Sequence, residues 1–219
     1  MSIPISPNTR PVTIDGPAGR LEAAIDAPVC DAALSQGVAV IGHPHPLYGG
    51  TMDNKVVQTI ARALLQLGYT TLRFNFRGIG ASEGAWDEGD GEKDDMMAVV
   101  GYARNLPEFV DKPQVPLVLA GFSFGSYIAS QVAEQLAQSE APAQRLILVG
   151  VAASRFSVAH VPGDSLVIHG EQDEVVPLAA VMDWARPQHM PVVVIPGVGH
   201  YFHGQLPLLK NIIIRNWQP

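Results

Sequence analysis

The sequence predicts an α/β fold, with a mostly parallel central sheet covered by helices on both faces. Short apolar runs alternate along the chain with stretches of helical periodicity. The composition agrees, because 47% of the 219 residues are hydrophobic and only 16% are charged, as in a chain with a large buried core. We see no repeat and no low-complexity linker, and we expect a single domain over residues 1–219.

The chain opens with a predicted antiparallel hairpin, residues 11–15 and 20–26, around the turn Gly16-Pro17-Ala18-Gly19. Residues 37–42, GVAVIG, form an apolar run that ends in glycine, which is typical of a buried parallel strand. Residues 54–67 place apolar side chains at helical spacing, and Gly68 follows in the position that commonly ends a helix.

The same alternation continues to the end of the chain. Residues 70–76 predict a strand, residues 77–91 a glycine-rich loop, and residues 92–105 a helix. The later elements follow from the same two patterns: strands over 116–121, 145–151, 165–170 and 191–197, and helices over 124–137, 177–185 and 205–216. Right-handed crossovers between parallel strands bring every strand-to-helix loop to one edge of the sheet. Residues that lie far apart in sequence, each just after a strand, therefore converge there.

Charge and cysteine content exclude several functions. The formal net charge of −7 argues against nucleic acid or an anionic membrane as the main partner. The single cysteine, Cys30, excludes a disulfide within the chain and a cysteine-based zinc site. The first residues lack the apolar core of a secretion signal, and no run approaches the roughly 20 apolar residues of a membrane span. We expect a soluble, cytoplasmic protein that binds a small molecule and needs no cofactor.

A candidate nucleophile lies between a predicted strand and a predicted helix. Gly121-Phe122-Ser123-Phe124-Gly125 is a Gly-x-Ser-x-Gly sequence in the strand-turn-helix context that this motif requires. The turn is so tight that side chains two residues before and two after the serine have no room, and glycine supplies both positions. The same turn aims the backbone N–H of Phe124 at the place where an oxyanion would form.

A serine nucleophile needs a histidine base and an acid that orients it, and in this arrangement the acid and then the histidine follow the serine along the chain. The loop after strand 165–170 offers Glu171, Asp173 and Glu174 as candidate acids. A purely structural alternative is that Asp173 caps the following helix. The loop after the last predicted strand offers two candidate bases, His200 and His203.

The loop HPHPLYGG after strand 37–42 is expected to donate a second N–H to the oxyanion. Pro44 and Pro46 have no N–H, which leaves His45, Leu47 or Tyr48, and we favour His45 or Leu47. A metal site on His43 and His45 would also need an acid such as Asp53. We expect His43 instead to hydrogen-bond within the loop and support its shape.

The glycine-rich loop 77–91 lacks the Lys-Ser/Thr of a phosphate-binding loop. We expect Arg77 to pair with a nearby acid. Trp86 is expected either at the edge of the pocket or in the core.

Taken in order, HPHPLYGGTMDNK, RFNFRGIGASEG, GFSFG, HGEQDEVVP and GVGHYFHG resemble small bacterial α/β-hydrolases without a cap domain. The group is similar to carboxylesterases and dienelactone hydrolases. The resemblance implies the α/β-hydrolase fold and a Ser–His–Asp triad, with Ser123, Asp173 and His200 at the matching positions. Dienelactone hydrolases usually carry cysteine as the nucleophile, so the serine at position 123 argues against a dienelactone substrate.

The connection from Val151 to Ser165 holds only about a dozen residues, too few for a helical lid, so we expect an open site. The predicted function is hydrolysis of small carboxylic esters or thioesters through an acyl-serine intermediate. A small peptidase or amidase using the same triad is the alternative, and a non-catalytic binding protein is a third. The sequence predicts no oligomeric state.

Overall fold

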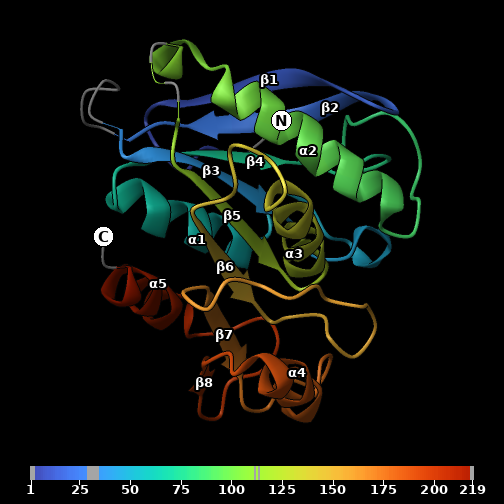
Figure 1. Ribbon diagram of the computed structural model, residues 1–219, viewed down its shortest axis with the longest axis vertical. Helices are drawn as coiled ribbons and strands as arrows, with labels where there is room; N and C mark the ends of the chain where they lie inside the picture. The colour runs from blue at the N-terminus through green and yellow to red at the C-terminus, as the bar shows by residue number, and fades with distance from the viewer. Residues whose placement is uncertain (1–2, 29–34, 111, 113, 218–219) are drawn as a thin grey trace.

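The centre of the molecule is a twisted sheet with two antiparallel strands at one side (Figure 1). The structure, a computed structural model, describes residues 3–28, 35–110, 112 and 114–217, so Cys30 lies outside the described residues. Within them, eight strands form one sheet in the order β1-β2-β4-β3-β5-β6-β7-β8. The first two pairings, β1 with β2 and β2 with β4, are antiparallel, and all the others are parallel. The predicted α/β fold is confirmed.

The observed strands follow the predicted apolar runs closely: β1 Thr9–Gly16, β2 Gly19–Asp26, β3 Gly37–Gly42, β4 Tyr69–Phe74, β5 Leu117–Phe122, β6 Arg145–Val149, β7 Leu166–Gly170 and β8 Val192–Ile195. Three strands, β4, β6 and β8, end earlier than predicted, and a left-handed glycine follows two of them. After β6, Gly150 has a φ of 59°, and after β8, Gly197 has a φ of 71°. Such left-handed backbone cannot continue a strand, so each chain turns away at its glycine.

The helices also lie where helical spacing predicts them: α1 Lys55–Gln66, α2 Asp90–Arg104, α3 Phe124–Leu136, α4 Leu178–Ala185 and α5 Leu206–Asn216. Among the described residues, three single-turn 3₁₀ helices were not predicted: η2 Pro46–Tyr48, η3 Pro107–Phe109 and η4 Arg186–Gln188. Each begins with or contains a proline whose fixed φ suits one helical turn.

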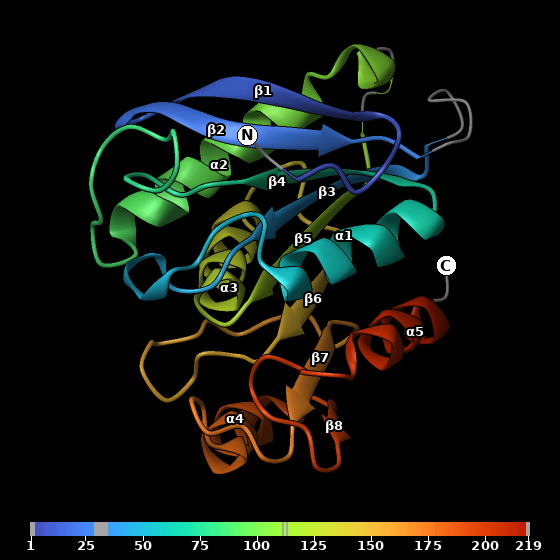
Figure 2. The ribbon, with the colours of Figure 1, turned by 180° about the vertical axis from the view of Figure 1, so that it is seen from behind.

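Helices cover both faces of the sheet, with α2 and α3 on one face and α1 and α5 on the other (Figures 1 and 2). Successive residues of a strand point to opposite faces, and the core divides accordingly. In β3, for example, Val40 belongs to the apolar cluster under α2 and α3, while Ile41 belongs to the cluster under α1 and α5. Burial on both faces explains why the parallel strands read as continuous apolar runs.

A buried ion-pair cluster ties the antiparallel strands to the start of α1. The Arg73 guanidinium on β4 is fully buried, 2.8 Å from an Asp26 oxygen on β2 and 2.9 Å from an Asp53 oxygen in the loop before α1. A buried arginine without such partners would destabilise the fold. The cluster therefore fixes the end of the loop that begins after β3 and passes the candidate site.

Residues 150–165, all of them described, contain no helix between β6 and β7. The predicted absence of a helical lid at this position is confirmed. None of the helices among the described residues has the length and apolarity that a membrane span requires.

Candidate active site

Ser123 occupies a strained turn between β5 and α3. Its φ of 54° and ψ of −115° are unfavourable for a residue with a side chain. A Cβ on Gly121 would lie 2.1 Å from the carbonyl carbon of Gly125, and a Cβ on Gly125 would lie 2.2 Å from the Gly42 oxygen. The structure thus supports the predicted need for glycine on both sides of the serine, because the turn packs backbone against backbone.

Asp173 and His200 meet at the ends of β7 and β8. The Nδ1 atom of His200 is 2.7 Å from the Oδ2 atom of Asp173, and both residues are buried. The other carboxylate oxygen, Oδ1, accepts the N–H groups of Val175 at 2.9 Å and Val176 at 2.7 Å. Asp173 therefore shapes a turn with one oxygen and orients His200 with the other. It does not cap α4, which begins only at Leu178.

The hydrogen bonds of Asp173 also set its charge. Burial raises the pKa of this carboxyl, but the hydrogen bonds from His200 and Val176 lower it by more than burial raises it. The pKa of Asp173 therefore lies below its ordinary value. Asp173 is therefore ionised at neutral pH. The rival acids have other partners: Glu171 accepts the N–H of Gly197 at 2.8 Å, and Glu174 accepts the backbone N–H of His200 at 3.4 Å.

Ser123 and His200 line the same cavity, of about 370 Å³, at the carboxyl ends of the strands. His203, the rival base, is exposed and lies in the turn before α5. The described residues that line the cavity are Pro44, His45, Tyr48, Gly49, Gly50, Asn54, Ser123, Arg155, Val175, His200 and Tyr201. A larger cavity, of about 590 Å³, lies at the opposite edge of the sheet near Pro116 and Leu117, far from the strand ends that carry these residues.

A second histidine, His169, lies beside Asp173 and was not predicted. Its Nε2 atom is 2.9 Å from the Val176 carbonyl oxygen and 3.4 Å from the Oδ2 atom of Asp173. Burial lowers the pKa of His169, so its ring is neutral. The Nε2–H group then donates to Val176, while the buried Nδ1 atom has no hydrogen-bond partner among the described residues. In the sequence, His169 is only the penultimate residue of a strand, and nothing there indicates which way its ring turns.

The loop between β3 and α1 folds as the one-turn helix η2, with His45 at its N-cap. The Leu47 N–H donates to the Nδ1 atom of the His45 ring at 3.2 Å, and the Tyr48 N–H donates to the His45 carbonyl at 3.1 Å. The Leu47 N–H is thus already bonded, and the residue is 63% exposed, so this geometry favours His45 over Leu47 as the second oxyanion donor. Within the described chain, the backbone N–H groups of His45 and Phe124 have no acceptor.

His43 hydrogen-bonds within this loop and supports its shape, as predicted. Its Nδ1 atom lies 2.6 Å from the Pro44 oxygen, and its Nε2 atom accepts the N–H of Phe76 at 3.1 Å. Burial lowers the pKa of His43 to about 4, so the ring is neutral and its Nδ1–H donates to Pro44. With both nitrogens bonded and Asp53 paired to Arg73, the metal site considered for His43, His45 and Asp53 does not form. No group of at least three His, Cys, Asp or Glu side chains in the described part of the chain is arranged to hold a metal.

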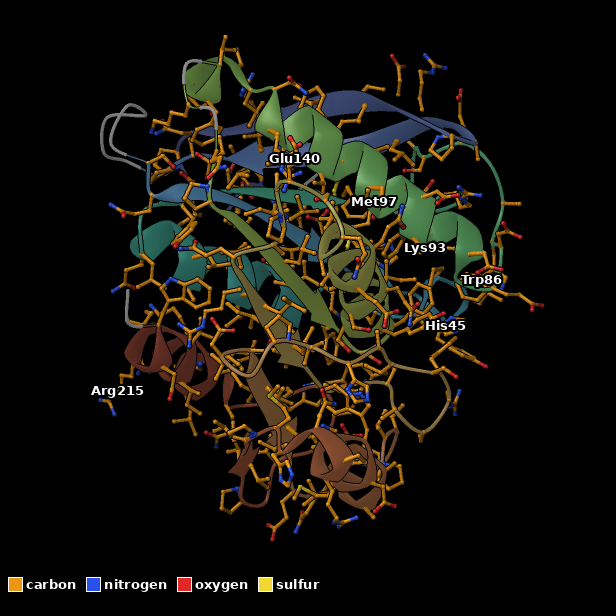
Figure 3. All side chains as sticks on the ribbon, viewed as in Figure 1. His45, Trp86, Lys93, Met97, Glu140 and Arg215 are labelled. Atoms are coloured by element: carbon orange, nitrogen blue, oxygen red, sulfur yellow. The ribbon has the colours of Figure 1, made fainter. Side chains whose placement is uncertain are left out.

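Aromatic rings pack around the imidazole of His45. Its centroid lies 4.6 Å from that of Trp86, 4.7 Å from Tyr48 and 5.4 Å from Phe124. His45 and Trp86 lie close together near one end of α2 (Figure 3). Trp86 thus supports the loop through its contact with the His45 ring and does not itself line the cavity. Burial lowers the pKa of His45, with a smaller contribution from the charge of Arg155, so this ring is also neutral at pH 7.

Arg77 pairs with an acid, as predicted. Its guanidinium donates to both oxygens of Asp95, at 2.8 Å and 3.0 Å, and lies 3.6 Å from Asp87. The pairing fastens the glycine-rich loop to α2, and Arg77 is not among the residues that line the cavity.

This fold, with a cavity at the carboxyl ends of the parallel strands, defines an α/β-hydrolase. The model of the serine aminopeptidase S33 family matches residues 47–159, a range that includes Ser123 and ends before Asp173 and His200. The chain belongs to this family of α/β serine hydrolases.

Solved structures agree over nearly the whole chain. An α/β serine hydrolase without a lid from Xanthomonas campestris is 38% identical, with a TM-score of 0.85 over 99% of this chain and 95% of its own. An α/β serine hydrolase homologue from Coxiella burnetii is 39% identical, with a TM-score of 0.81 over 99% of this chain and 100% of its own. These matches confirm the predicted resemblance to hydrolases without a cap.

An uncharacterised protein of Rickettsia prowazekii is 42% identical over 122 residues, which are 55% of this chain. The match spans about half, 48%, of that relative's length.

Proposed function

We propose that the protein hydrolyses small carboxylic esters or thioesters through an acyl-serine intermediate on Ser123. The observation that supports this most directly is the meeting of three strand-end loops. Ser123 and His200 line one cavity, and the Nδ1 atom of His200 is 2.7 Å from the carboxylate of Asp173. This carboxylate selects the tautomer with the proton on Nδ1, which leaves Nε2 free to accept a proton.

In the proposed reaction, the Oγ atom of Ser123 attacks the ester carbonyl while His200 Nε2 takes the hydroxyl proton. The negative oxygen of the tetrahedral intermediate accepts hydrogen bonds from the N–H groups of Phe124 and His45. His200 then returns the proton to the leaving alcohol or thiol as the C–O or C–S bond breaks. Water, deprotonated by His200, cleaves the acyl-enzyme and regenerates the serine. No cofactor takes part in these steps.

Amide hydrolysis is the second candidate, because the matched family is described as serine aminopeptidases. An aminopeptidase must hold the ammonium group of a peptide N-terminus, which calls for an acidic side chain at the site. None of the described residues that line the cavity is acidic, and Arg155 among them is cationic. The ester therefore fits the lining better than the peptide N-terminus.

The experiment is an ester and amide screen on the wild type and on Ser123→Ala. We expect hydrolysis of p-nitrophenyl butyrate but not of alanine p-nitroanilide, and loss of about 10⁴-fold or more in kcat for the variant, since the triad acts as a unit. A fluorophosphonate probe should label the wild type and not the variant. Residual activity above about a tenth of wild type in Ser123→Ala would contradict the proposal.

A matched pair of histidine variants serves as the control for the base in the same assay. His200→Ala should lose most of the rate, whereas His203→Ala should retain it, because His203 is exposed outside the cavity. The reverse result would mean that the base has been assigned to the wrong histidine. A wild type that reacts with neither the probe nor any ester would favour the non-catalytic alternative.

A further inference from the structure

Arg155 stands apart from the other described residues that line the catalytic cavity, because its side chain alone among them carries a permanent charge. It lies in the connection between β6 and β7 and is exposed at the cavity. The mechanism proposed above gives it no role. A cation at this position therefore needs its own explanation.

The backbone that carries Arg155 is fastened to α3. The ring of Phe156 stacks on that of Tyr127 at 4.8 Å, with an angle of 17° between the planes, and meets the Phe124 ring at 5.3 Å. The Gln131 side chain donates to the Ser157 carbonyl at 2.8 Å. These contacts hold the segment next to the residue that follows the nucleophile, so the origin of the Arg155 side chain is fixed relative to Ser123.

The guanidinium of Arg155 has no anionic partner in the described part of the chain. Arg20, Arg73 and Arg77 each lie 2.8 Å from a carboxylate oxygen. For Arg155 the structure gives only the Tyr48 ring, with the guanidinium carbon 5.9 Å from its centroid. An arginine presents five N–H donors in a planar fork that matches a carboxylate. These donors remain available at the cavity, although the chain as a whole is acidic, with a net charge of −7.

The charge of Arg155 also reaches the oxyanion loop. After burial, it is the second cause that lowers the pKa of His45. The neighbouring histidine is thereby kept neutral, and it does not compete with Arg155 for an anion. The lining therefore combines one cation with no acid.

We propose that Arg155 binds a carboxylate on the substrate, so that the preferred substrates are small esters that carry a negative charge near the scissile bond. This inference rests on the proposed esterase function and adds the substrate class. The carboxylate could belong to the acyl group, as in a dicarboxylic acid monoester, or to the leaving group. The chemistry recognised is the same in both cases, and the experiment separates them.

The test compares esters matched in size but not in charge. The acyl pair is mono-p-nitrophenyl glutarate and p-nitrophenyl valerate, and the leaving-group pair is 4-(butyryloxy)benzoate and its methyl ester. For each pair, the ratio of kcat/KM for the anionic ester to that for the neutral ester is measured. We expect Arg155→Gln to lower the ratio about tenfold in at least one pair, as the loss of a charge-assisted contact predicts. Raising the salt concentration should lower the wild-type ratio in that pair as well, through screening.

Arg215→Gln is the matched control, because it removes the same charge from the end of α5, where Arg215 projects away from the site (Figure 3). This variant should keep the wild-type ratios. Unchanged ratios in Arg155→Gln for both pairs, or an equal fall in Arg215→Gln, would overturn the role of Arg155 while leaving the esterase function intact.

A binding measurement separates failure of the anion site from failure of the esterase function. Monomethyl glutarate, with an acyl carboxylate, and 4-(butyryloxy)benzoate, with a leaving-group carboxylate, are each titrated by calorimetry into Ser123→Ala and into the double variant Ser123→Ala, Arg155→Gln. We expect affinity for at least one of these ligands to fall about tenfold in the double variant. If the wild type hydrolyses no ester but this difference is found, the anion site stands and the esterase function fails. Equal affinities of the two variants for both ligands would refute the anion site whatever the activity.

Discussion

At the scale of single residues, the site depends on side chains that hold loops and reacting groups at the same time. Asp173 closes a turn with Oδ1 and orients His200 with Oδ2. His43 joins the loop after β3 to the end of β4 through its two ring nitrogens. Both side chains are buried, so folding shifts the pKa of each as well as holding a loop in place. The free energy of unfolding should therefore depend on pH through these two residues.

The low pKa of His43 in the folded protein predicts that the protein becomes less stable in acid. Its pKa is about 4 in the folded protein and ordinarily about 6.5 in the unfolded chain. Between pH 4 and pH 6.5, His43 is therefore protonated in the unfolded chain and neutral in the folded protein. The contribution is fully present above pH 6.5 and is lost as the pH falls towards 4. By about pH 4.5 the free energy of unfolding should have dropped by roughly 2–3 kcal/mol from this residue. Urea unfolding at several pH values measures the slope.

The comparison variant is His43→Asn, which keeps an N–H donor for the Pro44 carbonyl but cannot titrate. Its unfolding free energy should depend less on pH in this window than that of the wild type, whatever its absolute stability. His203→Asn, at an exposed position, is the control and should keep the wild-type slope. A wild-type slope in His43→Asn would show that this histidine is not the group responsible.

At the scale of elements, the turn between β5 and α3 couples the nucleophile to its neighbours. Ser123 has unfavourable backbone angles, and Gly125 packs against the end of β3 at Gly42. The Ser123 N–H also donates to the Val149 carbonyl on β6 at 2.9 Å. The strained turn is thus supported from the strands on both sides of β5, which keeps the serine fixed while the chemistry proceeds.

Substitution of glycine in this turn should therefore be costly. In Gly125→Ala the new Cβ would lie 2.2 Å from the Gly42 carbonyl oxygen, and backbone must move to make room. We expect a loss of about 1–3 kcal/mol or more in unfolding free energy. Gly101→Ala is the matched control, because Gly101 lies in α2 with nothing within 4 Å of the added Cβ. That variant should gain about 0.5–1 kcal/mol. Equal stabilities in chemical denaturation would contradict the packing argument.

Elements were predictable where one local pattern decides them. The run GVAVIG marks β3 to the residue, because a strand buried on both faces is apolar throughout. Chain order and strand context restrict the acid and the base to a few candidates, and the resemblance to cap-less hydrolases selects Asp173 and His200 among them. The oxyanion loop could not be resolved in the same way. Whether the Leu47 N–H is free depends on the orientation of the His45 ring, whose Nδ1 atom accepts it. That ring packs against Trp86 and Phe124, which are distant from it in sequence.

At the scale of the whole molecule, the sheet brings the reactive residues to one edge and leaves that edge without a helical cover. The loops after β3, β5, β7 and β8 supply His45, Ser123, Asp173 and His200. The connection between β6 and β7, where a lid would have to lie, instead supplies Arg155 and packs onto α3 through Phe156. The cavity of about 370 Å³ that Ser123 and His200 line is partly walled and partly open to solvent.

This shape predicts a preference for short acyl chains. Each CH₂ that leaves water gains about 0.8 kcal/mol, close to fourfold in binding, but only carbons within the walled part of the cavity can gain it. We expect kcat/KM on neutral p-nitrophenyl esters to rise over the first few carbons and then level off, with acetyl to hexanoyl esters preferred over palmitoyl. Measurements below the solubility limit of each ester test this, and activity should show no jump at a lipid–water interface because no helical lid has to open. A steady climb through the lauroyl ester would instead require a long apolar channel, and the open-site argument from residues 150–165 would have to be given up.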